Sequence, residues 1–546
     1  MKYADKRILI VEDQRPFLML LRGLLNSMGA TDVVICGNAD QAVASCRKHK
    51  FDIVIADLHL GNEKKNGFEL IEELRVRKLV KPSTILLIIS ADSARPVVLG
   101  SIERRPDDYI VKPFSQAQLK SRLQRAWVKR QYMLPIYSAI LDDNWDNAIT
   151  QAQLLASEST PLQRHVNQLL VELYWHIADY PKALALIEKY ITKKTPLWAQ
   201  VAQGKTLNYL QRFEEAQAVA VSILSSNRFS AEAYDILAEA QNNLDKGDEA
   251  IDAIKQAIKI SPYSLQRHLT ACNIAKQNND YPLLTEASLS IWHLSKRTVH
   301  QDVSHWCNHM RSILDAAEHA TDKSQKNRYQ QEAILLVQRG KYDDSLVRYA
   351  DRFDIAIYEE LIHARIAALD GKMLDAKKQL MVSQQHIERK FGKIPSSFAP
   401  DSLKLMYDIG EWEEAQSLGK QLNDSDDGLD TYTQQLIQHE SALLAERQAN
   451  YTKHNKEGIE LYQQGKFEQA KAQFSLALEF SPVNSGVALN LIQCILKILD
   501  KGKKPEPLLV KECRRIYKVV DGMPLRQVHQ DKLKSLQEDI ERYLGK

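Results

Sequence analysis

The sequence has few cysteines, and none of them stand in a spacing typical of a metal site. Six cysteines are scattered over 546 residues without a Cys-x-x-Cys pair. This arrangement argues against a structural zinc site and against a disulfide framework. We therefore expect small buried or free thiols in the reducing environment of a cytoplasm.

Long apolar runs and an excess of one charge are also lacking. No run of about eighteen apolar residues occurs, and the chain starts without an apolar leader, so we expect a cytoplasmic protein without a membrane segment. The 73 basic residues are balanced by 70 acidic residues, and 20 glycines and 17 prolines are few for this length. Such a balance gives no electrostatic footprint for nucleic acid. The composition instead indicates a helix-rich chain, too long for one core.

Five apolar runs alternate with amphipathic stretches in the first 125 residues. They lie near 7–11, 33–37, 52–57, 84–89 and 108–112. This alternation predicts a parallel sheet with right-handed helical crossovers. The third run, F-D-I-V-I-A-D-L-H-L, places Asp57 where a buried strand meets solvent. Ligands of open α/β sheets bind beyond the carboxyl ends of the strands, so Asp57 is a candidate functional residue.

Three other strand ends carry groups with matching chemistry. The first run ends in Glu12 and Asp13, the fourth ends in Ser90, and the fifth ends in Lys112 followed by Pro113. Because the carboxyl ends of parallel strands meet at one edge, these side chains are expected to gather around Asp57. Acids, a hydroxyl and a lysine together predict a site that binds a cation and receives an anion.

The order and spacing of these motifs resemble the response-regulator receiver family. The resemblance rests on I-L-I-V-E-D, D-I-V-I-A-D-L, I-I-S-A and Y-I-V-K-P-F and covers residues 1–125. It implies a doubly wound, flavodoxin-like α/β domain with five parallel strands. It also implies that Asp57 accepts a phosphoryl group from a sensor histidine kinase or a histidine phosphotransfer protein.

The same resemblance assigns roles to the neighbouring residues. Mg²⁺ is expected to bind Glu12, Asp13, Asp57 and the backbone carbonyl of His59. This assignment is physically reasonable because Mg²⁺ prefers oxygen ligands, and a carboxylate attacks a phosphoryl group only when charge is neutralised.

The phosphoryl oxygens and the conformational switch have their own expected residues. Ser90 and Lys112 would hold the phosphoryl oxygens, and Ser90 and Tyr109 would move when the group binds. The family usually has the bond between Lys112 and Pro113 in the cis form. One departure is the stretch G-N-E-K-K before Asn66, which is about two residues longer than is typical and borders the pocket.

The last helix of the domain, about 115–132, is expected to continue toward Pro135 without a Gly/Ser linker. A helical linker over 126–136 would dock the first domain against the rest of the chain rather than tether it loosely.

From residue 134 onward a short phrase recurs, in which an aromatic residue and two mostly polar residues precede alanine. It ends at Ala148, Ala183, Ala216 and Ala250, with spacings of 35, 33 and 34 residues, and the next step falls on Leu284. A period near 34 resembles tetratricopeptide (TPR) helical hairpins. The small residue would allow two antiparallel helices to approach closely.

The phrase resumes less regularly at Ser345, Ala376, Ala415 and Ala470, and the best match to the consensus is Lys456 to Pro482. We predict an all-α superhelical solenoid with TPR-like repeats over 137–320, irregular repeats over 321–500 and capping helices over 501–546. Glycines near the turns are expected to be left-handed helix C-caps; these are Gly340, Gly371, Gly410 and Gly465. Polar or proline-containing breaks near 321–327, 393–401, 423–430 and 500–507 divide the array.

The solenoid carries no recognisable enzymatic motif, so its expected role is protein binding. We found no phosphate loop, metalloprotease motif or nucleophile elbow. His300, His305 and His309 fall on one face of an expected helix and are interpreted as packed or solvated residues rather than a metal site. The chain is therefore expected to be a phosphoacceptor and not an enzyme acting on other substrates.

The leading hypothesis is a response regulator whose repeats bind an unidentified protein in a phosphorylation-dependent manner, with a homodimer also possible. In one alternative, the tail binds the cognate kinase or phosphotransfer protein and inhibits or redirects phosphotransfer. A transcription factor and a phosphatase acting on another receiver are less favoured, because there is neither a helix-turn-helix signal nor an identifiable catalytic amide.

Overall fold

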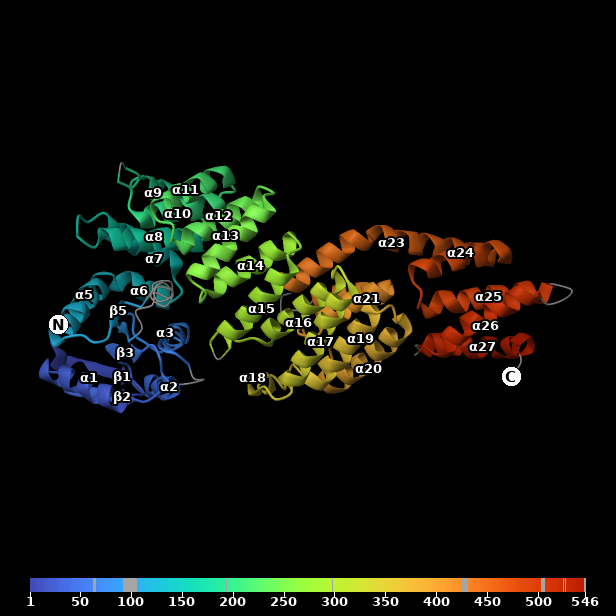
Figure 1. Ribbon diagram of the computed structural model, residues 1–546, viewed down its shortest axis with the longest axis horizontal. Helices are drawn as coiled ribbons and strands as arrows, with labels where there is room; N and C mark the ends of the chain where they lie inside the picture. Colours follow the sequence, from blue (N-terminus) through green and yellow to red (C-terminus); the bar gives the residue numbers. More distant parts are fainter. Residues whose placement is uncertain are drawn as a thin grey trace. The chain divides into compact units, whose positions relative to one another are not determined.

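The computed structural model forms two compact units, Met1–His305 and Trp306–Lys546. Figure 1 shows an N-terminal sheet domain followed by helices only. The structure describes residues 1–61, 65–91, 106–192, 194–296, 298–423, 431–501, 506–523, 525 and 527–544, without the side chains of 423 and 431–444. Three predicted features lie wholly or partly outside the described residues. They are most of the long loop before Asn66, residues 424–430 of the 423–430 break, and residues 502–505 of the last break.

The sheet has five parallel strands in the order β2-β1-β3-β4-β5. The strands are β1 (Arg7–Val11), β2 (Asp32–Cys36), β3 (Ile53–Asp57), β4 (Ile85–Ser90) and β5 (Asp108–Val111). The predicted doubly wound α/β fold is thereby confirmed. Strands β1, β3 and β4 are apolar and almost wholly buried, as expected of parallel strands that are covered on both faces.

Helices cover both faces of the sheet. Side chains of α1 (Arg15–Ser27) and α5 (Gln116–Tyr132) pack with one face, and those of α2 (Ala39–Lys48) and α3 (Gly67–Val76) pack with the other. Two of these helices begin with a capping box, Asn66 with Glu69 in α3 and Ser115 with Gln118 in α5. Such reciprocal bonds satisfy amide groups that a helix start leaves open, so they fix where each helix begins.

No flexible segment separates the sheet domain from the helices that follow. Met133 is both the C-cap of α5 and the N-cap of α6 (Leu134–Leu141), and Pro135 lies in the first turn of α6. The predicted helical connection is therefore present.

Five helical hairpins follow in the first unit (Figure 1). They pair α6 with α7 (Trp145–Ala156), α8 (Gln163–His176) with α9 (Tyr180–Glu188), α10 (Leu197–Tyr209) with α11 (Phe213–Ser226), α12 (Ala231–Asn243) with α13 (Gly247–Ile260), and α14 (Leu265–Gln277) with α15 (Tyr281–Ser295). The recurring phrase begins the second helix of each hairpin. Its alanines at 148, 183, 216 and 250 have no exposed surface, so they lie at the predicted close helix contacts.

The turns within these five hairpins share a left-handed residue two positions before the second helix. None of the five is glycine; they are Asp143, Ala178, Gln211, Asp245 and Asn279, with φ between 54° and 59°. In the second unit, Gly371, Gly410 and Gly465 are left-handed, as predicted. Gly340 is different, because it ends a helix and packs where an added Cβ would lie 2.9 Å from Trp306. The prediction of a left-handed cap was wrong there.

The second unit is also entirely helical in its described part. Its helices are α16 (Val303–Glu318, which begins in the first unit), α17 (Lys323–Gly340), α18 (Asp344–Val347), α19 (Ile355–Leu369), α20 (Met373–Phe391), α21 (Ala399–Ile409), α22 (Trp412–Asn423), α23 (Thr431–Gln463), α24 (Phe467–Phe480), α25 (Ser485–Lys501), α26 (Pro507–Asp521) and α27 (Gln527–Leu544). The phrase again falls at the start of α18, α20, α22 and α24. Within the described residues, none of the helices has the length and apolar composition required to cross a bilayer. The predicted residue limits within the array stay a prediction.

One expectation about the histidines was wrong. His300 precedes α16, which begins at Val303, so His300 does not share a helical face with His305 and His309. The sequence pattern continued the helix too far back, because residues 298–300 form a turn instead.

A fully buried carboxylate organises the interior of the second unit. Asp401 in α21 accepts hydrogen bonds from Arg311 Nε, Arg365 Nη1 and the Tyr358 hydroxyl, each at 2.8 Å. Both guanidinium groups are almost fully buried. Burial disfavours the charged form of Asp401, but Arg311 and Arg365 outweigh this effect and hold the pKa of the carboxyl below its usual value.

Candidate functional site

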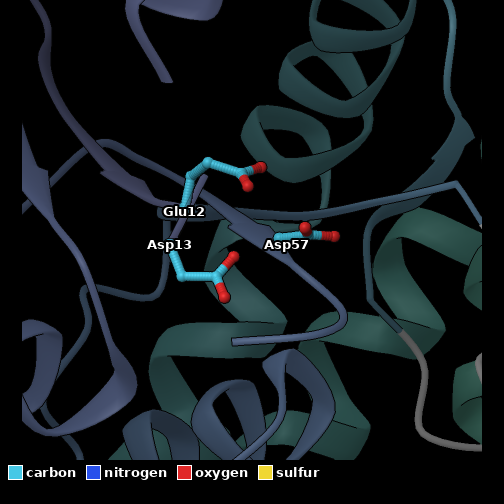
Figure 2. Close-up of side chains that lie close together, drawn as sticks. All are labelled: Glu12, Asp13 and Asp57. Atoms are coloured by element: carbon cyan, nitrogen blue, oxygen red, sulfur yellow. The ribbon is translucent and has the colours of Figure 1, made fainter. Parts of the chain in front are cut away.

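Three carboxylates meet at the carboxyl edge of the sheet. Glu12 and Asp13 follow β1, and Asp57 ends β3. One oxygen from each group lies within 4.8 Å of the others, and Figure 2 shows the three side chains gathered around a common space. The structure thus brings together the three acids that the sequence predicted as cation ligands.

Lys112, directly after β5, binds two of these acids. Its Nζ lies 2.9 Å from Asp57 Oδ2 and 2.8 Å from Glu12 Oε2. The ammonium group also lies 3.9 Å from the centre of the Phe17 ring, which packs edge-on against Phe114. The bond that follows Lys112 is cis, as the resemblance implied. The lysine is therefore held over the acids by two ion pairs and an aromatic ring face.

The acids differ in their surroundings. Glu12 is completely buried, Asp57 is 3% exposed, and Asp13 is exposed. Burial raises the pKa of the Glu12 carboxyl above its usual value, the hydrogen bond from Lys112 works against this rise, and the charge of Asp57 adds to it. The backbone N–H of Gln14 also donates to Glu12 Oε1. The buried pair therefore depends on Lys112 for charge balance.

One oxygen atom of this cluster shows whether the site suits a metal ion. Asp57 Oδ1 is buried and accepts no hydrogen bond from the described residues. An unsatisfied buried oxygen costs free energy, on the order of 1–3 kcal/mol, unless a partner reaches it. Mg²⁺ takes oxygen ligands in octahedral geometry and keeps several waters, so exposed Asp13 and this free oxygen of Asp57 suit such an ion. The residues present fit the expected cation.

The other predicted residues border the same edge. Ser90 is fully buried at the end of β4, and its backbone carbonyl accepts from the Lys112 N–H at 2.7 Å. Tyr109 in β5 lies opposite Ile88 and packs against the apolar core on the α2 and α3 face of the sheet. His59 lies two residues beyond Asp57 with an exposed side chain. Their roles in phosphoryl binding, switching and metal ligation stay predictions.

Gly67 contributes to the site in a way that the sequence did not predict, because the sequence pattern indicated only a turn at this position. Its N–H donates to the Leu58 carbonyl at 2.9 Å. A Cβ on Gly67 would lie 2.3 Å from the backbone oxygen of Asp57. The start of α3 therefore contacts the backbone of the acceptor residue, and only glycine allows so close an approach.

The described end of the long loop is fastened to α3. Lys65 Nζ lies 2.7 Å from Glu73 Oε2 and 3.3 Å from Asp40 Oδ1. Glu73 is 3% exposed and also binds Arg77 Nε at 3.0 Å. These four residues, with Arg47, line a small polar hollow of about 270 Å³ between α2 and α3.

Comparison with known families agrees with both parts of this architecture. Residues 8–124 match the response regulator receiver domain, and residues 201–264 match the tetratricopeptide repeat. The chain thus joins a receiver domain to a TPR region, as the sequence motifs predicted.

Curated relatives match part of the chain. The alkaline phosphatase synthesis transcriptional regulatory protein PhoP of Bacillus subtilis is 30% identical over 150 residues, which is 28% of this chain and 60% of PhoP. The alginate biosynthesis transcriptional regulatory protein AlgB of Pseudomonas aeruginosa is 32% identical over 114 residues, 21% of this chain and 24% of AlgB. The chain thus spans less than two thirds of the length of either relative.

Solved structures also align with the chain. A tetratricopeptide repeat protein from Parabacteroides merdae covers 47% of this chain and 92% of its own, at 10% identity and a TM-score of 0.28. The APC/C hetero-tetramer Cut9-Hcn1 covers 77% of this chain and 98% of its own, at 12% identity and a TM-score of 0.28.

Proposed function

We propose that this chain, a receiver domain joined to TPR repeats, is a two-component response regulator that is phosphorylated on Asp57 and binds a protein partner through its repeats. The observation that carries the proposal is the geometry around Asp57. One of its oxygens binds Lys112 at 2.9 Å, and the other is buried beside Glu12 and Asp13 with no hydrogen-bond partner among the residues that the structure describes. The donor would be a sensor histidine kinase or a histidine phosphotransfer protein.

The transfer uses the residues at this edge of the sheet together with the donor's phosphohistidine and Mg²⁺. A carboxylate oxygen of Asp57 attacks the phosphorus of a phosphohistidine, a P–O bond forms as the P–N bond breaks, and the leaving imidazole takes a proton. Lys112 would bind the incoming phosphoryl oxygens, while Glu12, Asp13 and Asp57 would hold Mg²⁺. When bound, the ion neutralises charge on the transferred group. In this proposal the chain is a phosphoacceptor and has no other substrate.

The repeats supply the output. Stacked helical hairpins expose a long surface without reactive groups, which suits the binding of a peptide or helix of another protein. Phosphorylation would alter partner binding by shifting the equilibrium between two arrangements of the chain, and a few kcal/mol suffices for such a shift.

The acceptor role is tested with a small phosphoryl donor. Full-length protein incubated with phosphoramidate and Mg²⁺ should gain one phosphoryl group that hydroxylamine removes, seen as a shifted band on a phosphate-affinity gel. Asp57→Asn should abolish the shift, and Asp40→Asn, which changes an exposed carboxylate on α2, should leave it intact. A full shift in Asp57→Asn would contradict the proposal.

The output role is tested with beryllofluoride, which stands in for the phosphoryl group. Proteins captured from lysate by the full chain, with Mg²⁺ present, should differ with and without beryllofluoride. The difference should vanish in Asp57→Ala. A captured set that ignores both changes would contradict phosphorylation-dependent binding.

A further inference from the structure

Helix α3 starts at the phosphoacceptor. Gly67, its first residue, packs on the backbone of Asp57, and Lys65 just before it binds the buried Glu73 on the same helix. A shift of the loop around Asp57 therefore acts on both the beginning and the middle of α3.

Glu72 in α3 and Lys78 just beyond the end of α3 contact the repeats. Glu72 Oε1 lies 2.9 Å from His300 Nε2, although 228 residues separate the two. Lys78 Nζ, two residues past the end of α3, lies 2.5 Å from Asp143 Oδ2. Asp143 is in the turn of the first hairpin, and His300 follows the fifth. Helix α3 and the turn that follows it therefore contact both ends of the five-hairpin array.

A buried contact lies beside these pairs. Arg130 of α5 binds both oxygens of Asp107 at 2.7 and 3.1 Å, donates to the Pro82 carbonyl and stacks 4.3 Å from the ring centre of Tyr137 in α6. Burial raises the pKa of the Tyr137 hydroxyl, and the charge of Arg130 works against this rise. This contact holds the beginning of the array against α5 independently of α3.

We propose that the α3 face of the receiver is a docking surface for the repeats of the same chain, and that phosphorylation of Asp57 releases it. We call the pairs Glu72 with His300 and Lys78 with Asp143 the α3 latch. This proposal rests on the proposed function, because it uses Asp57 as the acceptor. It adds the surface through which the modification reaches the array.

The chemistry of the latch suits a reversible contact. The paired side chains are 32% to 65% exposed, so solvent screens them and each pair alone contributes little. The latch can therefore open while Arg130 and Tyr137 keep the domains joined. With the latch closed, Lys112 binds the Asp57 carboxylate directly, and a phosphoryl group on Asp57 would displace this ion pair.

Hydrogen exchange of the full chain tests the proposal. With Mg²⁺ and beryllofluoride, amides of residues 298–305 and 141–145 should exchange about fivefold faster than with Mg²⁺ alone, a coupling of ordinary size. Asp57→Ala should remove this difference. Binding of beryllofluoride itself is measured in parallel by ¹⁹F NMR.

Reciprocity gives a second measurement. Opening the latch with Lys78→Ala and His300→Ala should tighten beryllofluoride binding about fivefold, because coupling acts equally in both directions. The matched control, Lys48→Ala with His293→Ala, changes exposed side chains on α2 and α15 and should leave the affinity unchanged. Exchanging the two charges of the pair between Lys78 and Asp143, as Lys78→Asp with Asp143→Lys, restores an ion pair and should return the affinity for beryllofluoride toward that of the wild type.

Failure of the two proposals can be told apart. The α3 proposal is overturned, and the acceptor role stands, if beryllofluoride binds at Asp57 but two results hold. Amide exchange is the same with and without beryllofluoride, and the affinity for beryllofluoride is the same in the wild type and in the variant Lys78→Ala with His300→Ala. If beryllofluoride does not bind, the acceptor role is overturned, and the α3 proposal falls with it.

Discussion

Replacing Asp401 by asparagine is expected to destabilise the second unit strongly. The substitution keeps the shape of the side chain but removes the negative charge that Arg311 and Arg365 share. Asp315 Oδ1 then remains as a counter-charge, 3.5 Å from Arg365 Nη2. Two guanidinium groups that are 1% and 2% exposed would lose their main counter-charge.

The size of the effect follows from this burial. Removing one partner of a buried ion pair costs about 3–5 kcal/mol, and the lower value suits asparagine because its carbonyl still accepts a hydrogen bond. For a unit of this size, 1 kcal/mol corresponds to a Tm shift of about 2–4 °C. We therefore expect the Tm of the second unit to fall by about 6–12 °C at neutral pH.

The same contacts predict a dependence on pH. Since the pKa of Asp401 is lowered in the folded chain, its contribution is complete above the pKa of an unfolded aspartate, about 3.9, and is lost as pH falls through the lower folded value. The gap between wild type and Asp401→Asn should therefore narrow in strong acid.

The assay is calorimetry of the full chain, compared between wild type and Asp401→Asn. Asp375→Asn, an exposed carboxylate on α20, is the matched control and should leave Tm unchanged. A fall of less than about 2 °C in Asp401→Asn would refute the reasoning that the carboxylate balances two buried charges.

Three further predictions concern the acceptor, the turns and a second titrating group. Lys112→Ala should slow phosphorylation of Asp57 by phosphoramidate by about 100-fold, since it removes a positioned cation from the transition state, and a gel time course against Lys120→Ala measures it. Gln211→Gly should raise the free energy of unfolding of the first unit by about 0.5 kcal/mol, because glycine adopts a φ of 59° without the strain of a side chain. The control Gln200→Gly, inside α10, should lower the free energy of unfolding, and urea unfolding compares the two variants. Burial raises the pKa of Asp408 to about 6 despite the opposing charge of Lys404. The folded chain therefore loses stability as pH rises from the unfolded aspartate value of about 3.9 to about 6, and the loss is complete above that, so Asp408→Asn should raise Tm at pH 8 but not at pH 4, as measured by calorimetry.

The acceptor cluster could be predicted from sequence because its signals are local. Each acid, hydroxyl or lysine follows an apolar strand, and parallel strands bring their carboxyl ends to one edge. The recurring phrase was equally informative, since Ala148 and Ala216 occupy a contact that only a small side chain permits. Patterns of this kind depend on neighbouring residues and on a fixed repeat, so they can be read without coordinates.

Other features depend on contacts between distant residues and left no local signal. Asp401 lies at the end of a polar, proline-containing stretch that suggested a break in the array, yet it is fully buried between two arginines. The left-handed turns at Ala178 and Gln211 use residues that avoid this conformation, because the packing of the two helices imposes it. The pairing of Glu72 with His300 joins positions 228 residues apart, across the five hairpins that lie between them in the sequence.

That pairing also limits how this chain can diverge. Repeat arrays ordinarily lengthen or shorten by whole hairpins, because each hairpin contacts only its neighbours. Here Lys78 just beyond α3 pairs with Asp143 in the first hairpin, and Glu72 of α3 pairs with His300 after the fifth, so both pairs can form only with this number of hairpins between them. A duplication of 34 residues in this stretch would fold locally and still separate Glu72 from its partner. Descendants of this chain should therefore vary in repeat number beyond His300 and keep five hairpins before it.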